Sequence, residues 1–337
     1  MTDFRWALIG PGPIAHTFAA AVAGIEGATL TRVLGRDAAR ANAFAAQWCM
    51  AGVAAATTQL NDVLHANDVD AVYIATPHAF HAEAIRACLN AGKPVLCEKP
   101  LVTDATTAAS LIELSREKNV FLMEAVWTRF LPIYAEVRQW LQTGAIGRLR
   151  AMQSSFCFNT PFNPASRLFD PAQAGGALLD IGIYNLTITR WAMACAFGKC
   201  PPASSIQSSA TLGPTGVDHR VAATIEFPGG VISQFVCALN GDAANAFSIF
   251  GERGTITLHA PFWGATHATL AVKGEMPVVL HRPHRVNGFE YEIEEAMRCI
   301  RAGRIESAAI SHEETRQTLA WLDTLRAQAG VRYPFEA

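Results

Sequence analysis

The spacing of apolar and polar positions divides the chain into two parts. Over the first 125 residues, short apolar runs alternate with longer Ala-rich stretches, which is typical of βαβ units and a parallel sheet. Further on, and clearly from about residue 149, apolar positions recur at every second residue over longer runs, as in half-buried antiparallel strands. We therefore expect two domains, residues 1–125 and 126–337.

In the first part the pattern predicts strands and helices in strict alternation. Gly92 is a good helix stop, and Thr103 or Asp104 is a good helix start. The expected strands cover residues 4–9, 29–34, 71–75, 94–98 and 120–123, and the expected helices cover residues 14–24, 38–48, 81–91 and 106–118.

In the second part, residues 221–227 and 231–239 flank Pro228-Gly229-Gly230 and predict a hairpin. The other runs predict a large, mostly antiparallel open sheet with helices on one face. Its further strands are expected at residues 205–212, 247–251, 255–259, 269–272 and 278–280, and its helices at 132–143, 178–196, 289–302 and 312–329.

Composition narrows the class of protein. Of 337 residues, 50% are hydrophobic and 17% charged, and the net charge of -2 gives no reason to expect nucleic acid or an anionic membrane as a partner. The chain has no basic leader before the first strand, and no apolar run approaches the roughly 18 residues of a membrane span. We expect a cytoplasmic protein whose eight scattered cysteines are reduced.

The strongest local motif is G-x-G-x-x-A, which follows the first predicted strand and opens the first predicted helix. Gly10 allows a tight turn, Gly12 lets the backbone approach a pyrophosphate, and Ala15 lets the helix pack closely. Pro13 and Ile14 lie at the helix start, where free N–H groups bind anions. The motif predicts a dinucleotide site.

The end of the second strand indicates which dinucleotide is bound. Proteins specific for NAD usually place an acidic residue there against the ribose hydroxyl, but this chain has Gly35 followed by Arg36. Arg36 can pair with a 2′-phosphate, so we expect NADP as the cofactor, with NAD as the alternative. Asp37 can be the N-cap of the next helix.

Polar residues also follow the next two strands, at the sheet edge where open α/β sheets bind ligands. Thr76, Pro77 and His81 follow one strand, and Glu98 and Lys99 follow the other. We assign all of them to cofactor binding. His78 and His81 alone lack the third ligand of a catalytic zinc site, so we expect no metal.

Four motifs in this order resemble the Gfo/Idh/MocA oxidoreductase family over essentially the whole chain. They are residues 10–15, Thr76-Pro77 with His81, residues 91–100 (AGKPVLCEKP) and residues 175–184 (GGALLDIGIY). Many members carry a His where this chain has Tyr184. With residues 123–130 (MEAVWTRF), the sequence is similar to the branch of dimeric dihydrodiol dehydrogenase, NADP-dependent xylose dehydrogenase and glucose-fructose oxidoreductase.

The resemblance implies an N-terminal Rossmann domain that binds NADP. It also implies an open C-terminal sheet that binds substrate and forms a homodimer, giving an α/β plus α+β fold. Lys99 and Tyr184 would lie close to the reacting carbon of a carbohydrate or cyclic diol. The implied reaction is hydride transfer between the nicotinamide and an aldose C1 hydroxyl or a trans-dihydrodiol.

The residue types agree with that chemistry. Oxidation of a hydroxyl requires removal of its proton, and a phenol such as Tyr184 can accept it if a cation such as Lys99 lowers its pKa. Asp180 lies four residues before Tyr184, which on an α-helix places both on one face. We therefore assign Lys99, Asp180 and Tyr184 to catalysis.

Aromatic and basic residues supply candidates for the substrate pocket. We select Trp127, Arg167 and Phe158, with Arg129, Phe156 and Phe169 as further candidates that are equally compatible with core packing. A catalytically silent NADP-binding sensor with this fold is the alternative function, because a Rossmann domain implies a ligand and not a reaction. Lys99, Asp180 and Tyr184 together favour the enzyme.

Overall fold

The computed structural model describes residues 3–336. Its first sheet has six parallel strands in the order β3-β2-β1-β4-β5-β6, which is the Rossmann order. This confirms the predicted parallel sheet. The strands are β1 (Phe4–Ile9), β2 (Ala28–Leu34), β3 (Ala56–Thr57), β4 (Ala71–Ile74), β5 (Val95–Glu98) and β6 (Leu122–Ala125).

Helices connect these strands, and local capping explains where several begin and end. The Asp37 carboxylate accepts the N–H of Arg40 at 2.8 Å, and Asp104 likewise caps its helix by accepting the N–H of Thr107 at 2.7 Å. Asn119 ends the second of these helices in the left-handed conformation, with φ of 53°. The helices are α1 (Pro13–Ala23), α2 (Ala38–Trp48), α3 (Leu60–Leu64), α4 (His81–Asn90) and α5 (Ala105–Lys118).

The chain returns to this first unit near its C-terminal end. One unit combines the residues up to Trp127 with Arg285–Arg316, which include α8 (Glu290–Arg301) and the start of α9 (His312–Ala329). Asn287 donates to the Thr17 carbonyl at 2.9 Å, and the Leu122 N–H donates to the Ile305 carbonyl at 3.0 Å. The predicted single boundary after residue 125 is therefore too simple, because these bonds join distant stretches of the chain.

The second unit combines Thr128–His284 with the residues from Gln317 on. Its eight-stranded sheet has the order β14-β13-β12-β11-β7-β10-β9-β8 and is antiparallel except for the parallel pair β7 and β10. The strands are β7 (Leu149–Cys157), β8 (Ser205–Leu212), β9 (Asp218–Phe227), β10 (Val231–Ala238), β11 (Phe247–Gly251), β12 (Gly254–Leu258), β13 (His267–Val272) and β14 (Val278–His281).

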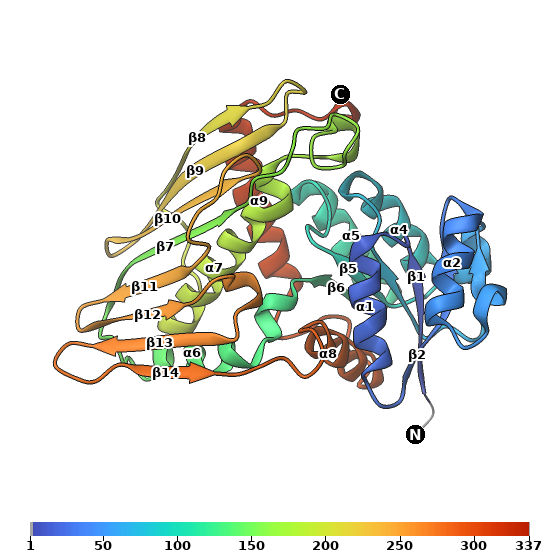
Figure 1. Ribbon diagram of the computed structural model, residues 1–337, viewed down its shortest axis with the longest axis horizontal. Coiled ribbons are helices and arrows are strands. Elements are labelled where there is room, and N and C mark those ends of the chain that lie inside the picture. The colour runs from blue at the N-terminus through green and yellow to red at the C-terminus, as the bar shows by residue number, and fades with distance from the viewer. Residues whose placement is uncertain (1–2, 337) are drawn as a thin grey trace. The chain divides into compact units, whose positions relative to one another are not determined.

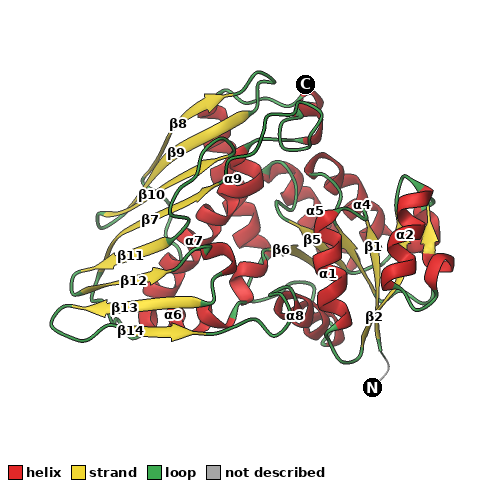
Figure 2. Cartoon of the chain, in the orientation of Figure 1, coloured by secondary structure: helices red, strands yellow, loops and turns green. Residues whose placement is uncertain are grey.

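The β9–β10 hairpin is confirmed, whereas the central strand β7 was not predicted. Helices α6 (Pro132–Gln142) and α7 (Ile183–Phe197) lie against one face of this sheet (Figures 1 and 2). In the described part of the chain no helix covers the other face. The second sheet is thus open on one side, as the alternation of its strands predicts.

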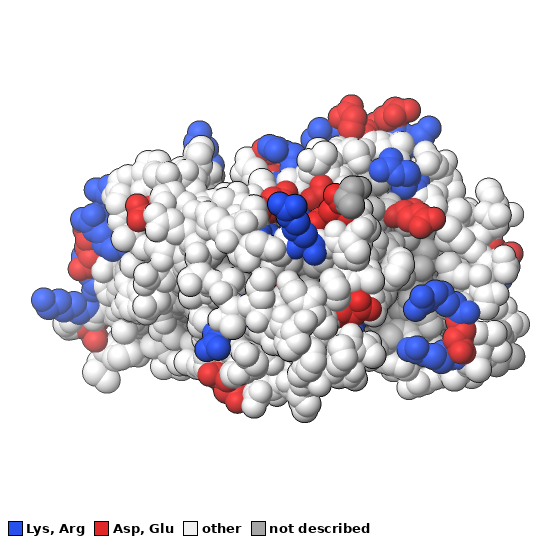
Figure 3. Space-filling view, turned by 90° about the horizontal axis from the view of Figure 1, so that it is seen from above, with Lys and Arg blue, Asp and Glu red and all other residues white. Residues whose placement is uncertain are grey.

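The surface carries charges of both signs. On the face drawn in Figure 3, Lys and Arg lie scattered among Asp and Glu, and uncharged residues cover most of the area. Among residues 3–336, none of the helices combines the length and apolar character that spanning a membrane requires.

Candidate active site

The turn between β1 and α1 is shaped for a phosphate group. Gly10 has φ of 92°, and a Cβ there would lie 2.9 Å from the backbone of Ala75, so a larger residue would clash. A Cβ on Gly12 would meet nothing within 4 Å, which leaves open space beside the backbone. Pro13 begins α1 and Ala15 is fully buried. The turn therefore has the predicted features of a pyrophosphate site at a helix start.

Two further groups of the first unit fit a bound dinucleotide. Ile14, on the first turn of α1, is an apolar side chain that is 39% exposed. The Thr76 hydroxyl, which follows β4, is buried and has no hydrogen-bond partner among the described residues. Pro77 directly follows it and begins the turn to α4. A ligand here would cover the isoleucine and satisfy the hydroxyl.

The end of β2 is tightly packed at Gly35. A Cβ there would lie 3.0 Å from Cγ of Pro11, so a larger residue would require the glycine-rich turn to shift by a few tenths of an ångström. Arg36 is exposed, and its guanidinium carbon lies 5.8 Å from the ring centroid of Phe80, itself 42% exposed. Since Asp37 is occupied as a helix cap, Arg36 is the charged group at this position that is available to a ligand.

His81 has a supporting position. It is fully buried, with Nε2 2.8 Å from the Thr76 carbonyl and Nδ1 2.9 Å from the Pro100 carbonyl. Burial lowers the pKa of His81, although these carbonyl contacts oppose the shift. Because both ring nitrogens face protein carbonyl groups, the imidazole supports the site through the backbone and offers no free nitrogen to a cofactor.

The segment that carries Lys99 is held on both sides. The Lys99 N–H donates to the Glu98 carboxylate at 3.2 Å, and Glu98 in turn accepts the hydroxyl of buried Tyr73. The Leu101 N–H donates to Glu124 at 3.0 Å. Burial raises the pKa of Glu124 to about 7. Lys99 therefore projects from a backbone fixed by two carboxylates, and Glu98 is part of that support.

In the second unit Tyr184 lies beside a cluster of aromatic side chains. Tyr184 is 6% exposed, and its ring centroid is 5.5 Å from that of Phe156 at the end of β7. Phe156 stacks on Trp263, with centroids 3.3 Å apart and planes at 4°, and Phe158 lies 6.4 Å from Phe156. The structure thus brings the predicted Phe158 and Phe156 together with the predicted proton-transfer group.

Asp180 is paired with Arg167. Nη1 of Arg167 donates to Asp180 at 2.8 Å, and the Asp180 side chain is 6% exposed whereas that of Arg167 is 50% exposed. Asp180 lies in Leu178–Gly182, a π-helical turn that leads into α7. The α-helical spacing expected between Asp180 and Tyr184 was therefore wrong in this detail, because a π turn is wider.

Three other pocket candidates have different surroundings. Phe169 is 2% exposed and packs 4.9 Å from His219, which makes it part of the core. Trp127 belongs to the first unit, where its ring lies 5.1 Å from that of Phe289. Arg129 is 6% exposed. Within residues 3–336, no three His, Cys, Asp or Glu side chains gather in a way that could hold a metal ion.

Comparison with known proteins decides the family. Residues 4–126 match the oxidoreductase family with an NAD-binding Rossmann fold, and residues 134–257 match the GFO/IDH/MocA C-terminal domain. The chain is 34% identical to human trans-1,2-dihydrobenzene-1,2-diol dehydrogenase and 33% identical to that of Macaca fascicularis, each over 98% of both chains. The chain belongs to the Gfo/Idh/MocA oxidoreductase family.

Solved structures show the same fold for this Gfo/Idh/MocA protein. An aldose-aldose oxidoreductase from Caulobacter crescentus, complexed with glycerol, has a TM-score of 0.85 at 21% identity over 97% of this chain and 98% of its own. Levoglucosan dehydrogenase with NADH and levoglucosan has a TM-score of 0.84 at 20% identity, over 98% of each chain. A 3-ketoreductase from Actinomadura kijaniata, with NADP and TDP-benzene, has a TM-score of 0.84 at 24% identity, over 97% of this chain and 98% of its own.

In this Gfo/Idh/MocA chain the sequence alone did not single out Trp263. It lies in a short turn, Phe262–Gly264, between β12 and β13, and its carbonyl accepts the Thr128 hydroxyl at 2.5 Å. The sequence offered one indication, the adjacent aromatic residues Phe262 and Trp263 in a turn, where the alternation of buried positions along a strand does not call for them. Its partner Phe156 lies more than a hundred residues earlier, so only the folded chain reveals the stack.

Proposed function

We propose that this protein is an NADP-dependent oxidoreductase that transfers a hydride between the nicotinamide and a hydroxyl-bearing carbon of an aldose or a trans-dihydrodiol. The observation that carries the proposal is Tyr184, a phenol placed against the stacked rings of Phe156 and Trp263. A proton-transfer group beside aromatic rings suits a ring-shaped substrate with hydroxyl groups.

The cofactor assignment rests on the first unit. The open space at Gly12, the exposed Arg36, and the Thr76 hydroxyl, which has no hydrogen-bond partner within residues 3–336, fit a dinucleotide with a 2′-phosphate. When bound, the dinucleotide supplies the nicotinamide ring that accepts or returns the hydride. Arg36 would pair with the 2′-phosphate, and the α1 N-terminus beside Gly12 and Pro13 would bind the pyrophosphate.

The protein's own groups would move the proton and orient the substrate. In the direction of oxidation, the Tyr184 phenolate takes the proton of the substrate hydroxyl, and in reduction the phenol returns it. A free phenol titrates near ~10, so the proposal requires the Lys99 ammonium to stabilise the phenolate. Asp180, held by Arg167, would orient a neighbouring hydroxyl group of the substrate.

The two substrate classes share one geometry. Relatives of 33–34% identity are named for a trans-dihydrodiol, and the similar structures include an aldose-aldose oxidoreductase. The stacked Phe156 and Trp263 suit the apolar face of a sugar ring as well as that of a cyclohexadiene diol. Neighbouring hydroxyl groups on a ring are the feature that both substrates present to Asp180 and Tyr184.

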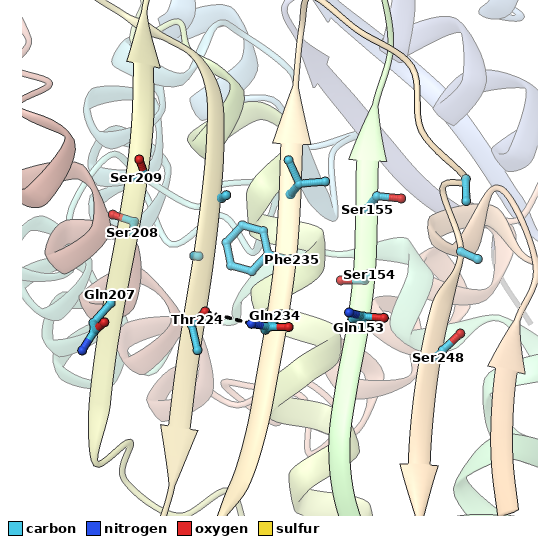
Figure 4. Close-up of a pocket in the computed structure, with 15 residues that line it drawn as sticks. Gln153, Ser154, Ser155, Gln207, Ser208, Ser209, Thr224, Gln234, Phe235 and Ser248 are labelled. Atoms are coloured by element: carbon cyan, nitrogen blue, oxygen red, sulfur yellow. Dashed lines mark hydrogen bonds between the residues drawn. The ribbon is translucent and has the colours of Figure 1, made fainter.

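We also propose a homodimer through the open face of the eight-stranded sheet. A row of uncharged residues crosses this sheet, and strand register places them side by side; Figure 4 labels the first five. The row consists of Gln207, Thr224, Gln234, Gln153, Ser248, Thr257, Thr269 and Val279. A shallow hollow of about 710 Å³ lies over its first strands. Because a two-fold interface brings a surface against its own copy, an uncharged row avoids self-repulsion.

The test of the proposed function is a panel of aldoses and cyclic trans-diols offered with NADP and with NAD. Absorbance of the reduced nicotinamide should rise with at least one class, and faster with NADP. NADP binding without turnover of any substrate would support the alternative, a silent sensor. Turnover with NAD alone would remove the 2′-phosphate assignment.

A further inference from the structure

The segment that carries Asp180 and Tyr184 begins without a cap of its own. Residues Leu178–Gly182 form a π-helical turn, and α7 follows directly. The residue before this turn is Ala177, whose methyl group cannot accept a hydrogen bond, and Gly182 provides no side chain at the start of α7. Since the first N–H groups of a helix have no acceptors within it, another element must supply one.

That acceptor comes from the sheet. Asp218, the first residue of β9, is 1% exposed, and its Oδ2 accepts the Leu178 N–H at 2.6 Å. A carboxylate at a helix start also interacts favourably with the helix dipole. Burial raises the pKa of Asp218 to about 7, while backbone N–H groups such as that of Leu178 oppose the shift. The fold thus holds the Asp218 carboxyl group in a buried position, where burial disfavours its ionised form.

The Gly175-Gly176 pair is built around this carboxylate. Gly176 has φ of 123°, and a Cβ there would lie 2.3 Å from Oδ1 of Asp218. A Cβ on Gly175 would lie 2.7 Å from the carbonyl oxygens of Arg167 and Leu168. The glycine pair therefore allows the backbone to pass between the Asp218 carboxylate on one side and the loop backbone at Arg167 and Leu168 on the other.

The C-terminal tail holds the same turn from a second direction. The Tyr333 hydroxyl donates to the Gly175 carbonyl at 2.8 Å, and Tyr333 is 3% exposed. The guanidinium carbon of Arg326 lies 4.9 Å from the Tyr333 ring centroid, which fixes the ring in place. Asp218 and Tyr333 thus bind consecutive parts of one turn, at Leu178 and Gly175.

We propose that Asp218 is a positioning residue for the reaction. Its carboxylate fixes the helical turn that bears Asp180 and the start of the helix that bears Tyr184, and the Tyr333 hydroxyl fixes the same turn through a second hydrogen bond. This inference rests on the proposed function of Tyr184. Loss of the bond from Leu178 would let the π turn shift, and small displacements of reacting groups lower the rate strongly. The effect should fall on kcat, since the NADP-binding residues belong to the other unit.

The experiment compares Asp218→Ala, which removes the acceptor of the Leu178 N–H, with the control Glu226→Ala, at an exposed acid on the same strand. For the well-folded Asp218→Ala protein we expect kcat to fall about 10-fold or more. NADP affinity should stay within about 2-fold of wild type, a difference well under 1 kcal/mol. Hydrogen exchange of the peptide covering residues 176–184 should become faster. Tyr333→Phe, which removes only one hydroxyl, should change exchange and kcat in the same direction but less.

A double-mutant cycle separates positioning from general loss of structure. If Asp218 acts through Tyr184, adding Asp218→Ala to Tyr184→Phe should cost little further rate, because both changes remove one contribution. Fully multiplicative losses, unchanged exchange at 176–184, or unchanged kcat in Asp218→Ala would each overturn the inference. Nearly full activity of Tyr184→Phe alone would instead overturn the proposed function, whereas the exchange measurement would still report whether Asp218 holds the turn.

Discussion

Arg167 and Asp180 form an ion pair in which the carboxylate is buried and the guanidinium is half exposed. Their Nη1–Oδ1 distance is 2.8 Å, with side-chain exposures of 50% and 6%. The pair joins the loop before Gly175 to the π turn that precedes Tyr184. The arginine is thus the part of the pair that a substrate can still reach.

Removing Arg167 should take away the guanidinium that pairs with the buried Asp180 carboxylate at 2.8 Å. We expect Arg167→Ala to lower kcat/KM by about 10- to 100-fold, because a contact to a charged group is worth roughly 1.5–3 kcal/mol. Steady-state kinetics on the best substrate measures this. Arg282→Ala, which breaks the comparable Arg282–Glu136 pair of the same unit, is the control and should change kcat/KM little. Equal losses in both variants would contradict a role at the site.

Tyr184 and Lys99 should matter to similar extents. Tyr184→Phe and Lys99→Met are each expected to lower kcat by about 10²- to 10⁴-fold, the usual cost of losing a positioned acid or base. Both must still bind NADP. Tyr134→Phe is the matched control, since its buried hydroxyl donates to the Phe262 carbonyl and its loss should lower stability and leave turnover per folded molecule unchanged. More than about a tenth of wild-type kcat in Tyr184→Phe would exclude the assignment.

Arg36 should determine the choice of cofactor. Arg36→Ala is expected to weaken NADP by about 10- to 150-fold, the equivalent of 1.5–3 kcal/mol for an ionised hydrogen-bonded contact, and to leave NAD nearly unaffected. Fluorescence titration with both dinucleotides provides the measurement. Arg116→Ala, at a half-exposed arginine on α5, should alter neither. Equal weakening of NADP and NAD would show that Arg36 does not contact the 2′-phosphate.

The open sheet face should be sensitive to added charge. Gln234→Lys places a cation in the uncharged row, and a two-fold dimer would then bring like charges together. We expect light scattering at micromolar concentration to show a dimer for the wild type and a shift to monomer for this variant. Gln59→Lys, at an exposed position of the first unit, should leave the dimer intact. A wild-type monomer would remove the proposal.

Glu292 should reduce stability at high pH. It is fully buried on α8, neither of its carboxylate oxygens has a partner among residues 3–336, and burial, with the charge of Glu98, raises its pKa well above the usual range. The folded state therefore binds a proton that the unfolded state releases above about pH 4.5, so stability falls as pH rises from there.

Glu292→Gln removes this dependence. Relative to wild type, the variant should gain up to about 1.4 kcal/mol for each pH unit between about pH 5 and the folded pKa. Chemical denaturation at pH 5 and pH 8 measures the difference, with Glu117→Gln on the exposed side of α5 as the control. If the difference in unfolding free energy between variant and wild type did not change with pH, the raised pKa of Glu292 would be contradicted.

The first sheet could be predicted because its signals are local. The glycine turn, the caps at Asp37 and Asp104 and the buried strand runs each lie within a few residues of the element they define. The central strand β7 was missed because its burial pattern does not alternate regularly, and because its parallel pairing with β10 depends on a distant part of the chain.

The candidate site could be predicted only in part. Tyr184, Asp180 and Lys99 stand in motifs, so their residue types could be read directly from the sequence. The π turn, the Phe156–Trp263 stack and the cap from Asp218 depend on contacts between segments tens of residues or more apart. No local pattern encodes such a contact. In the sequence, the aspartate at the start of β9 cannot be distinguished from an ordinary turn residue, because its hydrogen-bond donor, Leu178, lies 40 residues away.

The return of Arg285–Arg316 to the Rossmann unit has a consequence for protein engineering. Cutting the chain after Trp127 would remove the Ile305 carbonyl that pairs with Leu122 in β6 and the Thr315 hydroxyl that donates to Glu124 at 2.9 Å, next to the Lys99 segment. A transplantable cofactor module must therefore be assembled from two stretches joined by a new linker. In evolutionary terms, recombination at a single crossover point cannot exchange this half of the protein without damaging it.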